Sequence, residues 1–499
     1  MKNLQKNLLI EKIINNSKNY SKLKIISDYK NSVNFSELIN LALSNTSVIA
    51  NIKNDYIPIL IDRNIDSVLA ILSVILSKKA FCPISSSFPN ERINNIFKIL
   101  GTKKFINCSK KKISLPANFE EIKINKINSL NKMRSKKSFI LPSLLQDPKQ
   151  TFYVLFTSGS TGAPKGVKLS YSNIYNTLMW SKKYLSWKDQ KIGIATQFSF
   201  DISMFDLFSC LFFKVPTFIL SDPANPFKTY KEIQGKKITS IFSVPTFFSS
   251  FAKFKLLNKK IKLKRIISGG DFFPPKDILL WKNNTTCKII NVWGPTETSI
   301  VNTMYKISNK DNKNLLLGKN LPVGISERRM EINVLKNKKI VKNNTIGEIC
   351  MSGNCVASGY LGHIKNKKNF IKLNGKRSYL TGDNGYFDKK GFLYILGRKD
   401  NTIKISGYRV DALELQNLVN KMPDVSNSIA LSIKKDGINI LTLAIETHKN
   451  ISIEKIKNKL KINLPSYSIP KQIEFFKKFP LNPNSKIDRK KIIKLFNDK

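Results

Sequence analysis

The stretch "LFTSGSTGAPKGVKL" (Leu155–Leu169) decides the fold, because it is a polar, glycine-rich loop set between two apolar segments. It contains three glycines, four hydroxyl residues, a proline and two lysines. A Walker phosphate loop has the pattern G-x-x-x-x-G-K-[ST] and is followed by a helix. Here Lys165 precedes Gly166, and the residues after it have the pattern of a strand. We therefore predict a loop that joins two strands.

The content of this loop favours an oligophosphate ligand over a flexible connector. Gly159, Gly162 and Gly166 permit positive φ angles, so backbone N–H groups can turn inward and form a nest for an anion. The hydroxyl residues add donors, and Lys165 adds a positive charge. A solvated Ser/Gly linker seldom carries a Pro-Lys-Gly sequence between buried strands.

The segments around the loop alternate short apolar strands with helical patterns. This rhythm indicates an α/β fold with mixed, largely parallel sheets in a large N-terminal domain. From about Gly347 the strands are punctuated by glycine, which predicts an antiparallel, β-barrel-like part with a hairpin turn at "KKG". We expect strands at 56–61, 152–156, 240–244, 265–268 and 288–293, and helices at 64–79 and 172–185, the latter capped by Ser172.

A smaller unit follows the glycine-punctuated strands. Its length of roughly 100 residues is normal for a small domain. We place the boundary near Asp400, which divides the chain into an N-terminal core (1–399) and a C-terminal α+β domain (400–499). Within the small domain we expect helices at 412–421 and 453–462 and strands at 428–433 and 438–446.

The chain is strongly basic, with a formal net charge of +51 over 499 residues. Such a charge can mark a surface for nucleic acid or an anionic membrane. The lysines, however, are spread over the whole length together with many Asn and Ile residues. This distribution favours a general composition bias, and we expect no nucleic-acid partner.

Cysteine and histidine usage argues against disulfides, zinc sites and His-based triads. The six cysteines contain no C-x-x-C pair, and there are two histidines, His363 and His448. The longest apolar run, 68–76, is far shorter than the roughly 20 residues of a membrane span. We expect no signal peptide, no membrane span and a cytoplasmic location.

Four motifs in fixed order resemble the signatures of the adenylate-forming ligases, the superfamily of acyl-CoA synthetases, luciferases and nonribosomal peptide synthetase adenylation domains. The resemblance extends from about residue 30 to about residue 495. The motifs are "YVLFTSGSTGAPKGV" (153–167), "NVWGPTET" (291–298), "YLTGDNGYFDKKGFLYILGRKDNTIKISGYRVD" (379–411) and "PLNPNSKIDRKKI" (480–492).

The stretch "FSFDISMFDLF" (198–208) resembles the amino-acid-activating branch of that superfamily. The resemblance implies that Asp201 pairs with the α-ammonium group of the substrate. The stretch is also similar to that of D-alanine–carrier protein ligases. With no carrier segment and no condensation-type double-His motif in the sequence, we expect a free-standing enzyme that acts on a carrier protein in trans.

The resemblance implies ATP and Mg²⁺ as cofactors, with Glu297 as the metal ligand. Trp293 would stack on adenine, Thr296 would contact the α-phosphate, and Asp383 would bind the ribose hydroxyls. The expected catalytic residues are Thr157, Lys165, Glu297 and Lys486. The expected nucleotide-binding residues are Thr157, Ser158, Gly159, Ser160, Thr161, Gly162, Lys165, Trp293, Gly294, Thr296, Asp383 and Arg398.

The same resemblance implies an apolar substrate pocket and a moving C-terminal domain. Lys486 would reach the substrate carboxylate in the first half-reaction. Asp400 would be the hinge, and Gly407 would come close to the active site for thioester formation. The pocket residues would be Asp201, Ile202, Phe205, Ile267, Gly269, Val292, Ile300, Val301 and Lys486, which predicts a small or medium apolar amino acid, D-alanine among the candidates.

Three alternatives stay open at this point. An acyl-CoA synthetase or another carboxylic-acid ligase would share the ATP motifs but would not need Asp201. A basic nucleic-acid-binding protein would leave those motifs unexplained. A non-catalytic relative is disfavoured because the expected residues are all present, namely Lys165, Glu297, Asp383, Arg398 and Lys486. The nearly histidine-free composition suits adenylate formation, since a carboxylate nucleophile needs no general base and catalysis rests on positioning and charge neutralisation.

Overall fold

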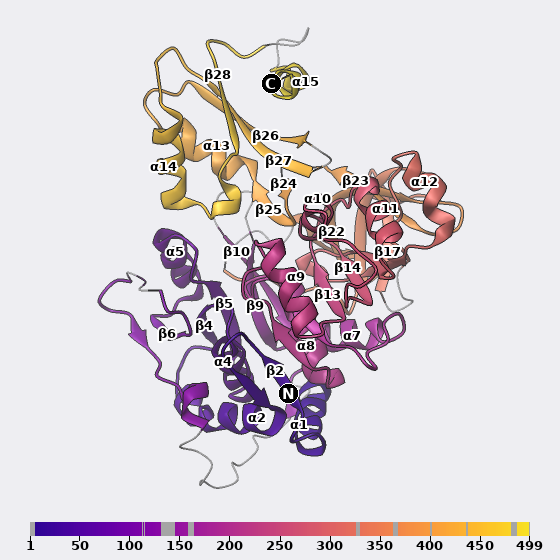
Figure 1. Cartoon of the computed structure of the whole chain (residues 1–499). Coiled ribbons are helices and arrows are strands. Elements are labelled where there is room, and N and C mark those ends of the chain that lie inside the picture. Colours follow the sequence, from indigo (N-terminus) through magenta and orange to yellow (C-terminus); the bar gives the residue numbers. More distant parts are fainter. Residues whose placement is uncertain are drawn as a thin grey trace.

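The computed structural model is mixed α/β and describes residues 5–111, 113, 115–130, 145–157, 164–325, 330–362, 368–399, 402–435, 438–480 and 487–498. Figure 1 shows the indigo and magenta sheets in the lower part of the view and the orange and yellow C-terminal elements above them. The fold class expected from the sequence is confirmed, including the antiparallel sheet that follows the parallel ones.

A seven-stranded sheet, ordered β20-β10-β9-β5-β4-β6-β7, contains the two strands that flank the opening stretch. Strands β9 and β10 pair antiparallel, with Lys165 opposite Thr157, so the predicted strand–loop–strand arrangement is confirmed. The remaining strands run parallel from β9 to β7. Their bounds are β4 Tyr56–Ile61, β5 Ala80–Ser85, β6 Lys104–Asn107, β7 Glu120–Glu121, β9 Thr151–Thr157, β10 Lys165–Ser170 and β20 Gly359–Tyr360.

An eight-stranded sheet, ordered β16-β15-β14-β13-β11-β12-β2-β3, lies beside it. Its central strands are parallel and its outer strands, β16 and β3, are antiparallel. Their bounds are β2 Lys24–Ser27, β3 Ser32–Asn34, β11 Ile192–Ile194, β12 Thr217–Ile219, β13 Ser240–Ser243, β14 Arg265–Ser268, β15 Lys288–Trp293 and β16 Thr303–Lys306. A short pair joins β1 Gln5–Lys6 to β8 Leu145–Gln146.

Helices cross between the parallel strands, as right-handed crossovers require. Helix α4 is apolar on nearly all sides because it packs against β4, β5 and α2 at once. The helices of this part are α1 Leu8–Asn19, α2 Phe35–Ser44, α3 Thr46–Ala50, α4 Ile65–Leu76, α5 Asn90–Leu100, α7 Tyr171–Ser181, α8 Asp201–Phe213, α9 Pro226–Gly235, α10 Pro245–Lys253, α11 Pro275–Asn284 and α12 Asn312–Leu316.

The predicted cap of helix α7 was wrong by two residues. The oxygen of Ser170, rather than Ser172, accepts the Asn173 backbone N–H at 3.3 Å. Ser172 lies in the first turn and donates its hydroxyl to the Pro148 carbonyl at 2.9 Å. The sequence places both serines at the start of the helix, and the end of strand β10 at Ser170 decides between them.

The antiparallel sheet has the order β18-β17-β19-β22-β21, with β23 paired to β22. The "KKG" hairpin is confirmed, because the Gly391 N–H donates to the Asp388 carbonyl between β22 and β23 at 3.0 Å. The strand bounds are β17 Met330–Lys336, β18 Lys339–Ile340, β19 Gly347–Gly353, β21 Phe370–Leu373, β22 Lys376–Phe387 and β23 Leu393–Arg398.

The C-terminal elements form a hairpin, β24–β25, and a three-stranded sheet, β26-β27-β28. The sequence did not indicate β28, which pairs parallel with β27, or the last helix. Asp400 lies outside the described residues, so the domain boundary stays a prediction. The bounds are β24 Thr402–Ile405, β25 Tyr408–Asp411, α13 Ala412–Asn420, β26 Asn427–Lys435, β27 Ile438–Glu446, α14 Ile453–Asn463, β28 Gln472–Phe476 and α15 Arg489–Asn497.

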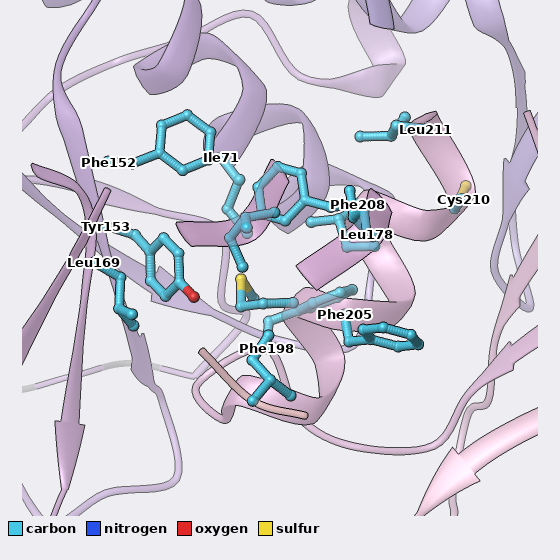
Figure 2. Packing of buried hydrophobic residues seen from close by; sticks show 14 of the residues in the cluster. Ile71, Phe152, Tyr153, Leu169, Leu178, Phe198, Phe205, Phe208, Cys210 and Leu211 are labelled. Atoms are coloured by element: carbon cyan, nitrogen blue, oxygen red, sulfur yellow. The ribbon is translucent and has the colours of Figure 1, made fainter. Parts of the chain in front are cut away.

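The main core joins the two large sheets through helix α8. Figure 2 shows Phe152 of β9 beside Phe208 of α8, with Tyr153 in the same cluster. The Phe208 ring lies 5.4 Å from that of Phe152 and 6.4 Å from that of Phe81, measured between centroids. This packing fixes the position of α8, whose first residue is Asp201. No helix within the described residues combines the length and apolarity needed to cross a membrane.

Removing the Phe208 ring is expected to destabilise the core that supports α8. Phe208 is fully buried, so Phe208→Ala should lower the free energy of unfolding by about 3–5 kcal/mol. Urea unfolding followed by circular dichroism measures the loss. Phe227→Ala is the matched control, since the Phe227 side chain is 50% exposed, and it should change little. Equal effects of the two substitutions would contradict this description of the core.

Candidate functional site

A cavity of about 120 Å³ lies where the carboxyl ends of β9 and β15 meet the start of α8 and the β24–β25 hairpin. Ligands of α/β proteins usually bind at this edge of a sheet. Its lining includes Thr157, Asp201, Thr296, Glu297 and Gly407, which are far apart in the sequence. The fold therefore brings together residues from four of the predicted motifs.

Asp201 is the first residue of α8, and the helix dipole favours its negative charge there. Its carboxylate accepts the Thr296 hydroxyl at 2.6 Å and the Ile202 N–H at 2.8 Å. Burial raises the pKa of Asp201, and these two hydrogen bonds oppose that rise. The site thus contains a desolvated carboxylate with no cation on it among the hydrogen bonds and ion pairs of the described residues.

Glu297 directly follows Thr296 in the short helix η2 (Thr296–Thr298). Its residue surface is 1% exposed. Its Oε1 accepts the Tyr360 hydroxyl at 2.9 Å and Arg409 Nη1 at 3.1 Å. The nearby Glu297 charge and burial both raise the pKa of Tyr360, with burial the larger cause. A buried carboxylate of this kind requires a cationic partner, which Arg409 supplies here.

Asp383, Arg398 and Trp293 form a second polar group on the same cavity. Asp383 and Arg398 are opposite each other in the β22–β23 register, and Arg398 Nη1 lies 3.2 Å from Asp383 Oδ1. Trp293 Nε1 donates to the other carboxylate oxygen, Oδ2, at 3.3 Å. The indole therefore has both a π face and a hydrogen-bond donor for this site.

Gly407 is in the turn of the β24–β25 hairpin and approaches the core closely. Its N–H donates to Asp271 at 3.4 Å, and its φ angle is +80°. A Cβ atom at this position would lie 2.1 Å from Val244 Cγ1, a distance no side chain tolerates. Glycine is required here for the hairpin to sit against the cavity.

An aromatic group holds the hairpin in place. The Tyr408 ring stacks on that of Tyr467 at 4.2 Å and meets the edge of Phe200 at 4.7 Å. Phe200 immediately precedes Asp201, while the two tyrosines belong to the C-terminal segment. These three residues, together with Phe242 and Arg409, were not predicted from the sequence as part of the site. Tyr408 and Arg409 directly follow Gly407 in the quoted motif, but their partners could not be identified from one sequence.

Some of the residues predicted to form an apolar substrate pocket line this cavity, and others do not. Ile202, Val292 and Ile300 line it, as does the unpredicted Phe242. Phe205, in contrast, is buried behind Phe242, with ring centroids 5.6 Å apart. The remaining predicted residues, Ile267, Gly269 and Val301, are outside the lining of this cavity.

Thr157 lines the cavity, and its buried hydroxyl has no hydrogen-bond partner among the described residues. Lys165 is the first residue of β10, and its Nζ lies 5.6 Å from the centre of the Tyr360 ring. Gly294 also lines the cavity. Several predicted residues lie outside the described residues: Ser158, Gly159, Ser160, Thr161, Gly162, Asp400 and Lys486.

A larger cavity of about 630 Å³ adjoins the first and shares Trp293, Asp383 and Lys404 with it. Its walls come from the core, at Gly270–Phe273, and from the C-terminal sheet, at Ala430 to Ser432. It therefore lies between two parts of the chain that are joined through the β24–β25 hairpin.

Comparison with known proteins identifies the family. The profile of the AMP-binding enzyme family matches residues 18–361. The chain belongs to the AMP-binding enzyme family. It is an adenylate-forming ligase. It is similar to D-alanine–D-alanyl carrier protein ligase of Listeria welshimeri serovar 6b, with 30% identity over 85% of each chain.

Two further similarities define how far the comparison extends. The chain is 29% identical to gramicidin S synthase 1 of Brevibacillus brevis over 88% of its own length, but it spans only 40% of that synthase. Its fold is similar to o-succinylbenzoate CoA synthetase of Bacillus subtilis, with a TM-score of 0.82, 19% identity and 98% coverage of each chain. That likeness shows a shared fold and nothing about the substrate.

The residues around the two cavities fit the nucleotide that this family name implies, and one of them could hold a cation. The Thr157 hydroxyl, which has no partner in the described part of the chain, offers a donor for phosphate oxygens, and the Glu297 carboxylate is the type of oxygen ligand that Mg²⁺ prefers. Asp383 presents a carboxylate beside an indole, a pairing suited to ribose hydroxyls and a flat base.

An ion pair joins the C-terminal segment to helix α5. Arg92 Nη1 lies 3.5 Å from Glu414 Oε1, and both side chains are largely buried. Burial raises the pKa of Glu414 from 4.5 to about 7, because desolvation outweighs the attraction of Arg92, and the nearby Asp411 charge adds to the rise. The contact is therefore sensitive to pH near neutrality.

Glu414 should make the protein less stable as the pH rises towards neutrality. Its raised pKa means that its contribution is fully present below about pH 4.5 and is lost as the pH passes through about 7. Melting temperatures of the wild type and Glu414→Gln, measured from pH 5 to 8, should show the wild type declining relative to the variant. The exposed Glu454→Gln serves as the control. Parallel curves for the wild type and Glu414→Gln would refute the assignment.

Proposed function

We propose that this adenylate-forming ligase activates a small apolar amino acid as its aminoacyl adenylate and then transfers it to the phosphopantetheine thiol of a separate carrier protein. The observation that carries this proposal is Asp201, a desolvated carboxylate at the wall of the cavity that also contains Thr296 and Glu297. An ammonium group is the partner that such a carboxylate lacks.

The first half-reaction joins the substrate carboxylate to the α-phosphorus of ATP and releases pyrophosphate. The carboxylate is ionised at neutral pH, so the protein has to position the reactants and stabilise charge rather than remove a proton. Thr157, Lys165 and Thr296 would donate to phosphate oxygens. When bound, Mg²⁺ neutralises phosphate charge, and Glu297 is the residue that would hold it. Lys486 remains the expected partner of the substrate carboxylate.

Asp201 would bind the α-ammonium of the amino acid. The pKa of Asp201 is raised by burial, and an ammonium group in contact would oppose that rise. The Thr296 hydroxyl donates to the Asp201 carboxylate at 2.6 Å and so orients it. An ammonium group on Asp201 would therefore lie next to Thr296, the residue that would contact the α-phosphate. One hydrogen bond would thereby couple recognition of the amino acid to the reacting phosphate.

The cavity favours a small side chain. Its apolar wall of Ile202, Phe242 and Val292 suits an apolar side chain, and the aromatic ring of Phe242 limits the room for a long one. The 30% identity to a D-alanine–D-alanyl carrier protein ligase supports D-alanine as the first amino acid to test. The handedness of the substrate does not follow from the apolar lining.

The second half-reaction would use the β24–β25 hairpin beside the larger cavity. We infer that residues 400–499 form a domain that rotates about Asp400, as in enzymes that run two half-reactions in one site. The cavity between the core and the C-terminal sheet would then admit the phosphopantetheine arm. A cytoplasmic carrier protein, itself acidic, would suit the basic surface of this chain.

ATP–pyrophosphate exchange across L- and D-amino acids, fatty acids and aryl acids tests the proposal. We expect exchange with small apolar amino acids and a loss of at least about 30-fold in Asp201→Ala, since removing one partner of a buried charge pair costs about 2–5 kcal/mol. Asp55→Ala is the control, because its carboxylate pairs with Lys79 at the surface. Exchange with aliphatic or aryl acids alone would instead identify a carboxylic-acid–CoA ligase.

A further inference from the structure

The Glu297–Arg409 ion pair connects the cavity to the C-terminal hairpin. Arg409 lies on β25, 112 positions after Glu297, and its Nη1 is 3.1 Å from Glu297 Oε1. The Tyr360 hydroxyl donates to the same oxygen at 2.9 Å. With a residue surface only 1% exposed, Glu297 has little access to solvent that could replace these contacts.

Arg409 reaches Glu297 only when the hairpin is seated against the core. Gly407, two residues earlier, contacts Asp271 and is packed on Val244. Tyr408, between them, is held by Phe200 and Tyr467. The chain from 407 to 409 therefore docks as one piece, so forming the ion pair and seating the hairpin are a single event.

The seated hairpin and a divalent cation held by Glu297 would compete for the same carboxylate. Both bring positive charge to Glu297, and the two charges would repel each other within a cavity of about 120 Å³. A buried carboxylate is nevertheless strongly destabilising without any cation. Glu297 therefore requires one cation at a time.

We propose that Arg409 is a positioning residue that replaces the divalent cation on Glu297, so that the hairpin seats after the metal has left with pyrophosphate. This inference rests on the proposed role of Glu297 as the metal ligand. It gives the order of the half-reactions a physical cause. Metal on Glu297 favours the unseated hairpin and adenylate formation, and Arg409 on Glu297 favours the seated hairpin and thioester formation.

Metal affinity tests the competition without relying on turnover. The probe is Mn²⁺, titrated in the presence of α,β-methylene-ATP, which cannot form an adenylate, and free Mn²⁺ is measured by electron paramagnetic resonance. Arg409→Ala should bind Mn²⁺ about three- to tenfold more tightly than the wild type, because a ligand's apparent affinity rises with the population of its competent state. Arg409→Lys, which keeps the charge, should restore most of the wild-type affinity.

A second variant, Gly407→Ala, tests the same competition independently in case Arg409→Ala folds poorly. Gly407→Ala leaves Arg409 intact but places a Cβ atom against Val244, so the hairpin cannot seat, and the same gain in Mn²⁺ affinity is expected. Lys449→Ala removes one positive charge from the same segment, where Lys449 pairs with Asp424 at the surface, and should match the wild type. Pantetheine aminoacylation should fall more in Arg409→Ala than pyrophosphate exchange does.

Glu297→Gln separates failure of this inference from failure of the proposed function. If Glu297→Gln binds Mn²⁺ as tightly as the wild type, Glu297 is not the metal ligand and this inference is overturned, whereas the proposed function is overturned only by the pyrophosphate-exchange assay. If Glu297→Gln loses Mn²⁺ but Arg409→Ala and Gly407→Ala show unchanged affinity, the metal role stands and the competition is refuted. A gain in Arg409→Ala that disappears when Glu297→Gln is added supports the competition.

Discussion

The charge on Glu297 is the constraint on which the arrangement of the site depends. Its carboxylate is buried, and its cation in this structure, Arg409, comes from the C-terminal segment. Tyr360 donates to the same oxygen and belongs to β20, the edge strand that pairs with β10 after the opening loop. One carboxylate thereby connects the proposed phosphate loop, the nucleotide side of the cavity and the hairpin of the C-terminal segment.

The fold supports this site through elements that are rigid for ordinary reasons. Helix α8 is held by aromatic packing on β9, so Asp201 is fixed at the helix start, where the dipole favours its charge. The register of the β22–β23 hairpin sets Asp383 opposite Arg398. Backbone pairing and core packing thus preorganise the polar groups before any ligand arrives.

Much of this could be predicted from the sequence, because local pattern determines it. The strand–loop–strand unit followed from the residues after Gly166, and the "KKG" hairpin followed from its glycine. Four residues that the motifs indicated line one cavity: Asp201, Thr296, Glu297 and Asp383. Their roles remain predictions. The net charge of +51 gave little guidance, since it is distributed over the whole chain.

What the sequence could not provide depends on contacts between distant residues. Phe242 of β13 lines the cavity, whereas Phe205 of α8 packs on the Phe242 ring, and one sequence does not reveal that contact between two elements. Arg409 and Tyr408 were within a quoted motif, yet their partners Glu297 and Phe200 are more than 100 positions away. Helix α7 was capped by Ser170 because β10 ends there, which is a property of strand pairing.

The most direct test of the central claim is a crystal structure with a sulfamoyl-adenosine analogue of the aminoacyl adenylate, made with the amino acid that exchanges fastest. The account predicts that the α-ammonium nitrogen lies within hydrogen-bond distance of Asp201, with the ribose hydroxyls on Asp383. An ammonium group that faces another residue, with Asp201 still bonded only to Thr296 and Ile202, would contradict it.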